Sequence, residues 1–441
     1  MTTPTRHISL RTRLLVATVL MGGVVPSPGS ISSAFADSPV AITFEKLERD
    51  RIFQHSPLLP PPIDATNRFQ MDDRAARLGQ RLFFDPRLSR NGKTSCATCH
   101  DPAKSFADGR TLSEGVATGD RHTPALWNVT HHRWLFWDGR ADTLWGQVAG
   151  PLENSIEMDG DRVSIARLIV QDDTLREAYA EVFGKLPNIS DTGRFPEAAR
   201  PLPHSPQDSR HRAWQSMRED DRESVSRVLA NVGKAIAAYE TRLISRDSPF
   251  DKFVVQLKRN EPLDAISASA QRGLKLFVGR ADCRQCHVGP MFTDGEFHNI
   301  RVPPLGGGEP IDAGRFRGIE LLRASPFNAA GRFSDARDGT AAKRLEFLAK
   351  PADSWGAFKT PSLRNVARTP PYMHQGQFAS LRDVLNYYST LEGAVVMGHH
   401  PETVLKPLFL DAQEIDDLIA FLDSLTDEAI EPSLLRAPDA P

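Results

Sequence analysis

The sequence predicts a mainly α-helical fold that consists of two similar domains in tandem. Signals for β-strands are few, whereas apolar residues recur at helical spacing in several segments. The pentapeptide Cys-x-x-Cys-His occurs at 96–100 and again at 283–287, and each copy follows a short helical segment, 74–84 or 268–277. The interval between the copies is too long for a solenoid repeat, so it indicates two domains that each carry one copy.

The two pentapeptides use all four cysteines of the chain. Each copy offers two thiols that can add to the vinyl groups of a haem, and an adjacent histidine that can bind the iron. A zinc site or a disulfide framework would leave the paired histidines unexplained. The sequence therefore predicts two covalently bound c-type haems in two cytochrome c-like domains. The predicted attachment and iron-binding residues are Cys96, Cys99 and His100 for the first haem, and Cys283, Cys286 and His287 for the second.

The first 36 residues predict a secretory signal peptide. Three arginines precede an apolar run over 14–25, and Ala34-Phe35-Ala36 is the small-x-small pattern that signal peptidase recognises. The apolar run is shorter than the roughly 20 residues of a spanning helix, which disfavours the alternative of an uncleaved anchor. We expect residues 1–36 to be removed and the mature protein to lie in the bacterial periplasm, where c-type haems are attached.

The charge balance disfavours two classes of partner. The chain has 54 Lys and Arg residues against 56 Asp and Glu residues. Such a balance gives no large field of one sign, so it predicts binding neither to nucleic acid nor to a membrane surface.

Between the two motifs, the sequence predicts an insertion, a helix and a domain boundary. Residues 193–222 are rich in Pro, Arg, Asp and Ser with little periodicity, and we expect a surface insertion there. An apolar stripe predicts a helix over 224–244. The segment 246–249 then marks the boundary, which divides the chain into an N-terminal domain, 37–248, and a C-terminal domain, 249–441.

Two helices are expected after the second motif. One begins near Leu381. The last begins at Asp411, because the Asp411 carboxylate can cap a helix that has Glu414 three residues further on and apolar residues at helical spacing thereafter.

Several further motifs occur in a fixed order: Leu-Phe-Phe-Asp-Pro at 82–86, Phe-Trp-Asp-Gly-Arg at 136–140, Gly-Pro-Leu-Glu-Asn at 150–154 and Pro-Tyr-Met-His at 371–374. Together with the first Cys-x-x-Cys-His motif, this order resembles the bacterial dihaem cytochrome c peroxidase and MauG superfamily. The resemblance covers nearly all of the mature chain except the insertion. It implies that the first haem reacts with peroxide, that the second transfers electrons or stores oxidant, and that Trp137 lies between them. By composition alone, Trp137 is a core aromatic residue.

The resemblance also implies a catalytic pocket at the first haem. Cleavage of peroxide requires an open iron position and a group that moves a proton from one oxygen to the other. Glu157 matches the acid/base residue of the family, although a glutamate after a turn is usually just solvated. Gln147 and Pro151 match the same pocket, where Gln147 can hydrogen-bond a bound oxygen and Pro151 shapes the cavity.

The sixth ligand of the second iron distinguishes two kinds of enzyme. The position of the ligand methionine in cytochrome c peroxidases, counted from His374, is Tyr388 in this chain. The MauG branch has tyrosine there. A phenolate is a hard anionic donor that stabilises oxidised iron, so Tyr388 implies a haem that holds an oxidising equivalent. The alternative is that Tyr387 and Tyr388 are ordinary aromatic residues of their helix and that Met397 or Met291 binds the iron.

The loop after the first motif differs from that of many cytochrome c peroxidases, in which a histidine blocks the peroxide iron at rest. Residues 112–119 contain no histidine, which implies an open iron. His122 lies where the family usually has an asparagine that helps to bind calcium between the haems. The carbonyl groups of Thr369 and Pro371 match the other calcium ligands, but imidazole is a poor ligand for calcium, so the presence of calcium stays open.

These observations predict a periplasmic dihaem oxidoreductase similar to MauG and its relative MbnH. Such an enzyme reacts with hydrogen peroxide to form a high-valent dihaem state and oxidises an aromatic residue of a periplasmic partner protein. This chain has Ala281 where MauG-like enzymes often have a surface tryptophan. One alternative is a cytochrome c peroxidase that takes electrons from a small electron-donor cytochrome. Another is a non-enzymatic dihaem electron-transfer protein or sensor, against which Glu157 and the open iron argue.

Overall fold

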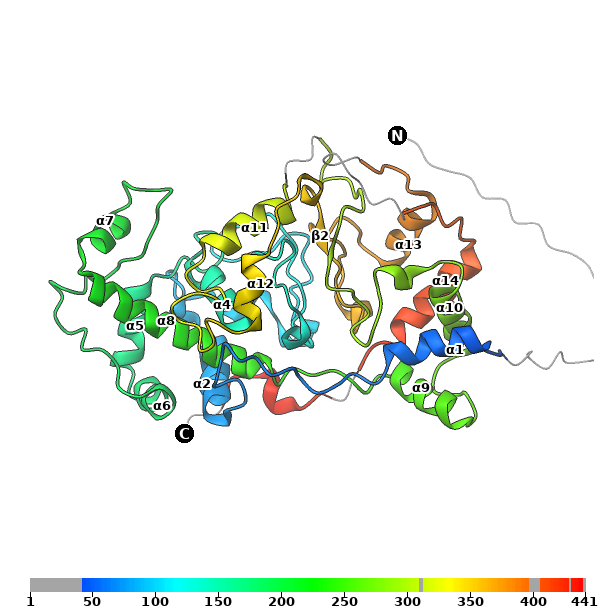
Figure 1. Cartoon of the computed structure of the whole chain (residues 1–441), viewed down its shortest axis with the longest axis horizontal. Helices are drawn as coiled ribbons and strands as arrows, with labels where there is room; N and C mark the ends of the chain where they lie inside the picture. The colour runs from blue at the N-terminus through cyan, green and yellow to red at the C-terminus, as the bar shows by residue number, and fades with distance from the viewer. Residues whose placement is uncertain (1–41, 309–311, 396–404, 428–429, 439–441) are drawn as a thin grey trace, which may run out of the picture. The chain divides into compact units, whose positions relative to one another are not determined.

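Helices dominate the computed structural model, which describes residues 42–308, 312–395, 405–427 and 430–438 (Figure 1). Within these residues the only sheet has two short antiparallel strands, β1 (Phe297–His298) and β2 (Phe358–Lys359). The prediction of a mainly α fold is confirmed. The predicted signal peptide, 1–36, lies outside the described residues. In the described part of the chain, no helix has both the length and the apolar character of a membrane span.

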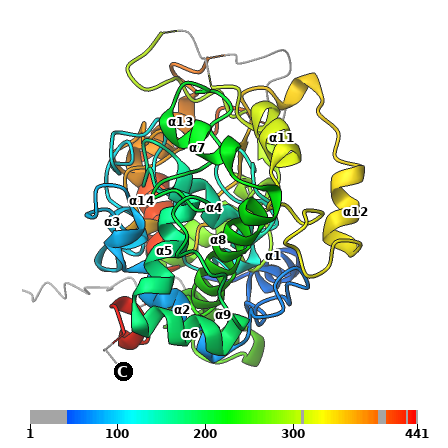
Figure 2. The same ribbon diagram turned by 90° about the vertical axis from the view of Figure 1, so that its left-hand side faces the viewer.

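The long helix α8 is at the centre of the helices of the N-terminal half (Figure 2). These helices are α2 (Asp73–Phe83), α3 (Cys96–Cys99), α4 (Leu144–Glu153), α5 (Arg162–Gln171), α6 (Asp173–Phe183), α7 (Ser209–Ser216) and α8 (Glu219–Glu240). Helix α8 packs against α2, α4 and α5. Its buried face includes Val225, Val228 and Leu229, which the sequence places on one stripe.

The helices of the C-terminal half pack mainly around the pair α10 and α14. They are α9 (Pro249–Arg259), α10 (Ala268–Val278), α11 (Arg315–Ala324), α12 (Thr340–Glu346), α13 (Leu381–Thr390) and α14 (Ala412–Asp423). Asp411 accepts a hydrogen bond from the Glu414 amide at the start of α14, as the sequence predicts. Helix α1 (Lys46–Ile52) lies beside α10 (Figure 1), so an N-terminal segment completes the C-terminal core.

The repeated glycines that precede each motif have a steric cause. A Cβ atom on Gly79 of α2 would lie 1.8 Å from the carbonyl oxygen of Ala235 on α8. A Cβ atom on Gly273 of α10 would lie 1.9 Å from the carbonyl oxygen of Asp417 on α14. Each half therefore contains a close helix crossing at which a side chain larger than that of glycine does not fit.

The internal repeat extends beyond the haem motifs. Thr-Pro-Ala-Leu-Trp-Asn-Val at 123–129 matches Thr-Pro-Ser-Leu-Arg-Asn-Val at 360–366. In both copies the asparagine has positive φ and precedes a turn of 3₁₀ helix. With the same alignment, the first residue of α4 matches the first residue of α13. The second copy has about 50 more residues between its motif and this segment, and these carry α11 and α12.

The two halves exchange segments, so each core is completed by the other half of the chain. Phe327 and Phe333 lie between α11 and α12 yet belong to the N-terminal core, whereas Ile52 belongs to the C-terminal core. The boundary at 248 and 249 coincides with the cap of α9 by Ser248. The division into 37–248 and 249–441 remains a proposal.

The predicted insertion, 193–222, is not wholly a surface feature. Phe195, Arg200 and Trp214 are buried, and the segment contains helix α7. The burial of these residues could not be predicted from periodicity, because isolated buried residues in an irregular segment give no repeating pattern.

Candidate functional site

The first haem motif forms helix α3, and its histidine is already oriented for ligation. His100 Nδ1 lies 3.1 Å from the carbonyl oxygen of Phe106. A hydrogen bond at Nδ1 fixes the tautomer and leaves Nε2 as the free ligand atom, as is usual for metal-binding histidines. Burial lowers the pKa of His100, which favours the neutral imidazole that binds iron.

The second motif repeats this arrangement. His287 Nδ1 lies 2.9 Å from the carbonyl oxygen of Phe292, and burial lowers the pKa of the imidazole. Both predicted histidine ligands therefore have the supporting hydrogen bond that their role requires.

A cavity of about 770 Å³ adjoins the second motif. Its size suits a cofactor, since such sites are commonly about 300–1,000 Å³. Cys283, Cys286 and His287 lie in its wall together with apolar side chains of the surrounding helices: Phe277, Leu381, Val384, Leu385, Leu418 and Leu422. A haem attached to both thiols would have its ring in apolar surroundings, as a buried macrocycle needs.

Two donors in the cavity wall fit the carboxylates of a haem. The indole Nε1 of Trp127 is buried and has no hydrogen-bond partner. Burial lowers the pKa of Lys359 to about 8, and its ammonium group makes no ion pair with the described residues. The unpaired buried donor of Trp127 is costly, and half-buried Lys359 carries a charge without an ion-pair partner among the described residues; anionic propionates would satisfy both. The residues present thus fit the group that the motif predicts.

The adjacent tyrosines of α13 have different surroundings. The Tyr387 hydroxyl donates a hydrogen bond of 2.6 Å to the carbonyl oxygen of Ile300. Tyr388 lies in the cavity wall with His287, and its hydroxyl makes no hydrogen bond with the described residues. Burial raises the pKa of Tyr388, so its phenol is protonated unless a cation such as iron stabilises the phenolate.

The methionines expected as alternatives do not line this cavity in the described residues. Met291 lies outside its wall, and Met397 falls outside the residues that the structure describes. Met373, which the sequence did not single out, does line the cavity.

Around the first motif, α4 and the loop after it carry the predicted peroxide residues. Gln147 and Pro151 lie on α4, one turn apart. Glu157 lies in the following loop, where Asn154 Nδ2 donates a hydrogen bond of 2.7 Å to its Oε1. Burial raises the pKa of Glu157 above its usual value, although Arg140 and the Asn154 bond act in the opposite direction. A carboxyl group with a raised pKa holds a proton more readily than an exposed one, which suits a group that accepts and returns a proton.

The repeat assigns equivalent positions to Pro151 and Tyr388. Both lie at the eighth residue of equivalent helices, α4 and α13. Proline has no side-chain donor atom for iron, whereas tyrosine has one. Equivalent positions of the two helices therefore carry a residue that can bind iron in α13 and one that cannot in α4.

Trp137 joins the two halves. Its indole Nε1 donates to the carbonyl oxygen of His122 at 2.8 Å, and its ring lies in the wall of the second-motif cavity. The His122 amide donates to the His374 carbonyl oxygen, and the Lys359 amide donates to the Trp137 carbonyl oxygen, both at 2.8 Å. Because the repeat makes His122 equivalent to Lys359 and Trp137 equivalent to His374, these two bonds are also equivalent.

Known proteins are similar to this chain over most of its length. Residues 73–259 match the family described as di-haem cytochrome c peroxidase. Cytochrome-c peroxidase IdrP2 of Pseudomonas sp. (strain SCT) is 31% identical over 86% of this chain and 87% of its own. Methylamine utilization protein MauG of Methylorubrum extorquens is 31% identical over 82% of this chain and 80% of its own. This chain belongs to the dihaem cytochrome c peroxidase family.

A solved structure agrees with this assignment. The crystal structure of a MauG-like protein associated with microbial copper homeostasis superposes with a TM-score of 0.62 and 27% identity, covering 87% of this chain and 97% of that chain. As a member of the family, the protein has two c-type haems and is a peroxide-dependent oxidoreductase that acts with a protein partner.

The calcium ligands expected for the family are only partly present. Thr369, Pro371 and His122 line the same cavity, but His122 Nδ1 lies 2.7 Å from the carbonyl oxygen of Arg110. Calcium prefers about six to eight oxygen ligands, and an imidazole engaged with a carbonyl does not replace one. The residues do not fit a calcium site of the usual family kind.

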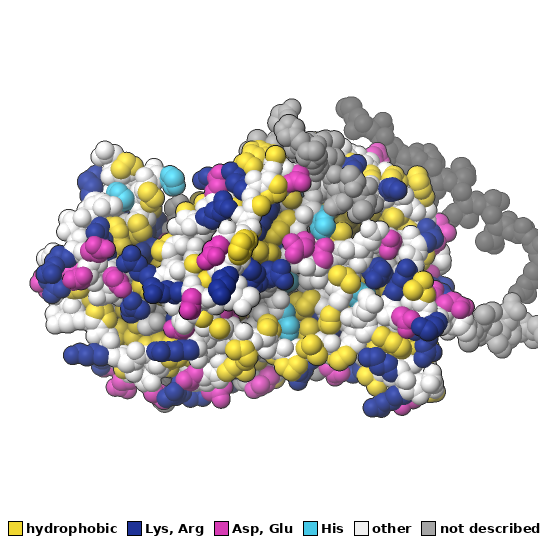
Figure 3. Space-filling model, viewed as in Figure 1, with side chains coloured by type: hydrophobic (Ala, Val, Ile, Leu, Met, Phe, Trp, Pro, Cys, Tyr) yellow, Lys and Arg dark blue, Asp and Glu magenta, His cyan; other side chains and the backbone are white. Residues whose placement is uncertain are grey.

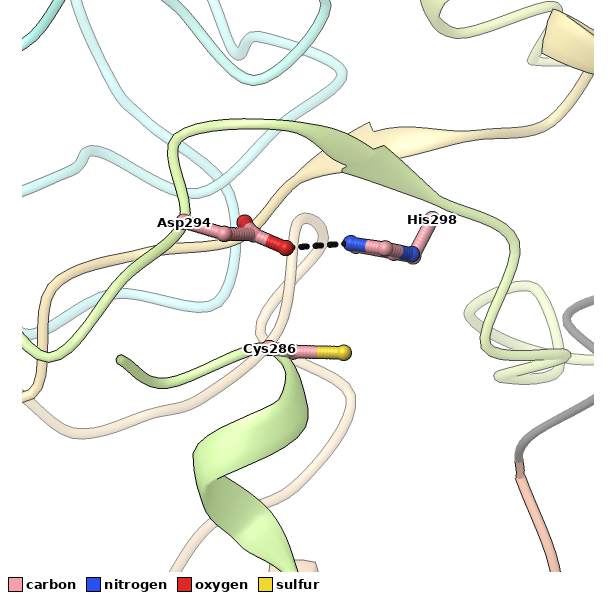
Figure 4. A group of neighbouring side chains, drawn as sticks. All are labelled: Cys286, Asp294 and His298. Carbon is pink, nitrogen blue, oxygen red and sulfur yellow. Dashed lines mark hydrogen bonds and ion pairs between the residues drawn. The ribbon is translucent and has the colours of Figure 1, made fainter. Parts of the chain in front are cut away.

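Figure 4 shows an arrangement beside the second motif that the sequence analysis missed. His298 Nε2 lies 2.7 Å from Asp294 Oδ2, and both ligand atoms lie within 4.8 Å of Cys286 Sγ. This geometry resembles a metal site, but Cys286 is a predicted haem-attachment residue in this family. We therefore interpret the Asp294–His298 pair as part of the wall around the haem edge. Only the three-dimensional fold brings these residues together, and no sequence motif marks them.

Proposed function

We propose that this protein is a periplasmic dihaem enzyme that uses hydrogen peroxide to oxidise an aromatic side chain of a partner protein. The observation that carries this proposal is Tyr388, which lies in the cavity of the second haem motif with His287. A phenolate ligand favours oxidised iron over reduced iron, whereas methionine favours the reduced state that a small donor cytochrome can supply.

The residues around the first haem motif support the peroxide step. When bound, the haems supply the redox chemistry, in which two electrons and two protons convert one peroxide molecule to two waters. Glu157 accepts a proton from the near oxygen of peroxide and returns it to the far oxygen, so that water leaves rather than hydroxide. Pro151 would supply no side-chain ligand atom to the first iron, and Gln147 would hydrogen-bond the peroxide. Trp137 connects this site to the second haem cavity.

The main alternative is a cytochrome c peroxidase. It is favoured by relatives such as IdrP2 and the cytochrome c551 peroxidase of Pseudomonas aeruginosa, which is 28% identical over 83% of this chain. In that case the electrons come from a small cytochrome instead of an aromatic side chain.

Peroxide turnover with and without a donor cytochrome distinguishes the two. The proposal expects slow turnover that the cytochrome does not accelerate, together with a mass increase or cross-link on a periplasmic partner protein after peroxide treatment. Rapid turnover that depends on the cytochrome, with no modified protein, would establish the alternative.

A further inference from the structure

The loop that carries Glu157 is held at both ends by one buried arginine from the segment 193–222. Arg200 is 0% exposed. Its Nη1 donates to the carbonyl oxygens of Glu153, at the end of α4, and Gly160, at the end of the loop, the latter at 2.7 Å. Its Nη2 donates to Asp159 Oδ1 at 2.5 Å. A single guanidinium group therefore closes the loop over 153–160.

Asp159 is the centre of this arrangement. Its carboxylate also accepts hydrogen bonds from Arg210 Nη1 at 2.9 Å and from Arg90 Nη1 at 3.2 Å. Asp159 has a φ of 47°, a left-handed conformation that is uncommon for a residue other than glycine. The three arginines hold the carboxylate in place, so they stabilise a backbone conformation that the loop alone would rarely adopt.

The opposite side of the loop is fixed by the segment after the first haem motif. The amide of Val116 donates to the carbonyl oxygen of Glu157 at 2.8 Å, and the amide of Ala117 donates to that of Ile156 at 2.9 Å. A Cβ atom on Gly115 would lie 2.3 Å from the Glu157 carbonyl oxygen, so the two segments are in close contact. The loop thus lies between residues 115–117 and Arg200.

We propose that Arg200 is a positioning residue that fixes Glu157 for proton transfer to and from peroxide. The proposal rests on the acid/base role proposed above for Glu157. The carboxylate must reach peroxide oxygens at hydrogen-bond distance, and an error of about 1 Å in such a position can cost about 10²-fold in rate. The segment 193–222 therefore serves the peroxide site as well as the fold, because it delivers the guanidinium that closes the Glu157 loop.

The test uses the full-length haem-loaded enzyme and a double-mutant cycle. We expect Arg200→Met to slow the reaction of the enzyme with peroxide by up to about 10²-fold. If Arg200 acts through Glu157, the double variant Arg200→Met/Glu157→Gln will be no slower than Glu157→Gln alone. Amide hydrogen exchange of residues 154–160 should be faster in Arg200→Met, which provides a readout independent of turnover.

A matched control comes from the same segment. Arg194 pairs with Asp221 at 2.5 Å and makes none of the described contacts with the Glu157 loop. Arg194→Met should lower thermal stability without changing the peroxide rate. Asp159→Asn has nearly the shape of the parent side chain but removes its charge and one of its two acceptor oxygens, so it tests the same contact if Arg200→Met does not fold. Arg200→Lys should recover part of the rate, since lysine keeps the charge but not the fork of donors.

The possible results separate the two proposals. If Glu157→Gln reacts at the parent rate, the proposed role of Glu157 is wrong, and the positioning role of Arg200, which depends on it, is wrong as well. If Glu157→Gln is slow but the effects of the two substitutions multiply, or Arg200→Met and Asp159→Asn react as fast as the parent, only the positioning role is refuted.

Discussion

Glu157 illustrates how the environment of one residue sets its chemistry. Burial raises the pKa of its carboxyl group, and proton acceptance from peroxide requires the ionised form. The rate should therefore fall as the pH decreases through this raised pKa. The fall begins at a higher pH than it would for an exposed glutamate.

Replacing the carboxylate tests this account. Glu157→Gln keeps the shape and the contact with Asn154 but removes the proton acceptor. Groups of this kind contribute about 10²- to 10⁴-fold, so we expect the peroxide reaction to slow by a factor in that range with haem content unchanged. Stopped-flow absorbance measures the rate, and the acid limb of its pH profile should disappear in the variant. A variant that kept both the rate and the acid limb would show that another group moves the proton.

Tyr388 and Tyr387 provide a matched pair at the second haem. If phenolate binds the iron, Tyr388→Met should raise the reduction potential of this haem and weaken its ability to hold oxidant. Tyr387→Phe removes only the hydrogen bond to Ile300 and should leave the potential nearly unchanged. A spectroelectrochemical titration measures both. Equal potentials in the parent and in Tyr388→Met would show that Tyr388 is not the ligand.

At the scale of helices, close crossings such as that of α2 and α8 at Gly79 determine how the helices pack. Gly79→Ala places a methyl group within 1.8 Å of the Ala235 carbonyl oxygen, and the backbone of α8 must move to accommodate it. Overpacking of a core typically costs about 1–3 kcal/mol. We therefore expect the free energy of unfolding of Gly79→Ala to be lower than that of the parent by an amount in this range or larger. Gly193→Ala is the control, because the nearest atom to its new Cβ is a side-chain oxygen at 3.2 Å. Denaturant unfolding of the two variants measures the difference, and equal stabilities would refute the steric role of Gly79.

Sequence reasoning performs best where a local pattern has a local cause. The expected helix over 74–84 is observed as α2 (Asp73–Phe83), and the expected 268–277 is observed as α10 (Ala268–Val278), because apolar spacing and caps determine both. The helix expected over 224–244 is observed as α8 (Glu219–Glu240). It begins earlier than expected because its acidic first turn stabilises the start of the helix.

The contacts of Arg200, which sequence reasoning missed, are long-range. Arg200 has no motif around it, and its role depends on where α4 ends and the Glu157 loop returns. Nothing in the sequence distinguishes Trp127 and Lys359 from other residues of the repeat, and only the fold shows that both line one cavity. The partners of Arg200 at Gly160 and Asp159 are 40 and 41 residues away in the chain, and Trp127 and Lys359 come from different halves. Neither hydrophobic periodicity nor helix capping contains that information.

At the scale of the whole molecule, the two halves are related by an internal repeat whose contacts are reciprocal. The His122 and Lys359 amides donate to equivalent carbonyl oxygens across the interface, and each core contains residues from the other half. On the surface, basic and acidic side chains are intermixed over the face seen in Figure 3, in keeping with the balanced composition. Function therefore depends on where the two halves differ.

Pro151 and Tyr388 are such a difference, and exchanging it tests the meaning of the repeat. Pro151→Tyr places a phenol on α4 at the position that Tyr388 occupies on α13. If equivalent positions face equivalent irons, the new side chain should bind the first iron, convert it to a six-coordinate state and suppress the reaction with peroxide. Pro151→Ala lacks a donor atom and should retain a five-coordinate first iron. Electron paramagnetic resonance of the two ferric variants distinguishes these coordination states. A five-coordinate first iron in Pro151→Tyr would show that α4 and α13 do not present equivalent positions to their haems, so that the open site must arise from something other than the loss of a ligand.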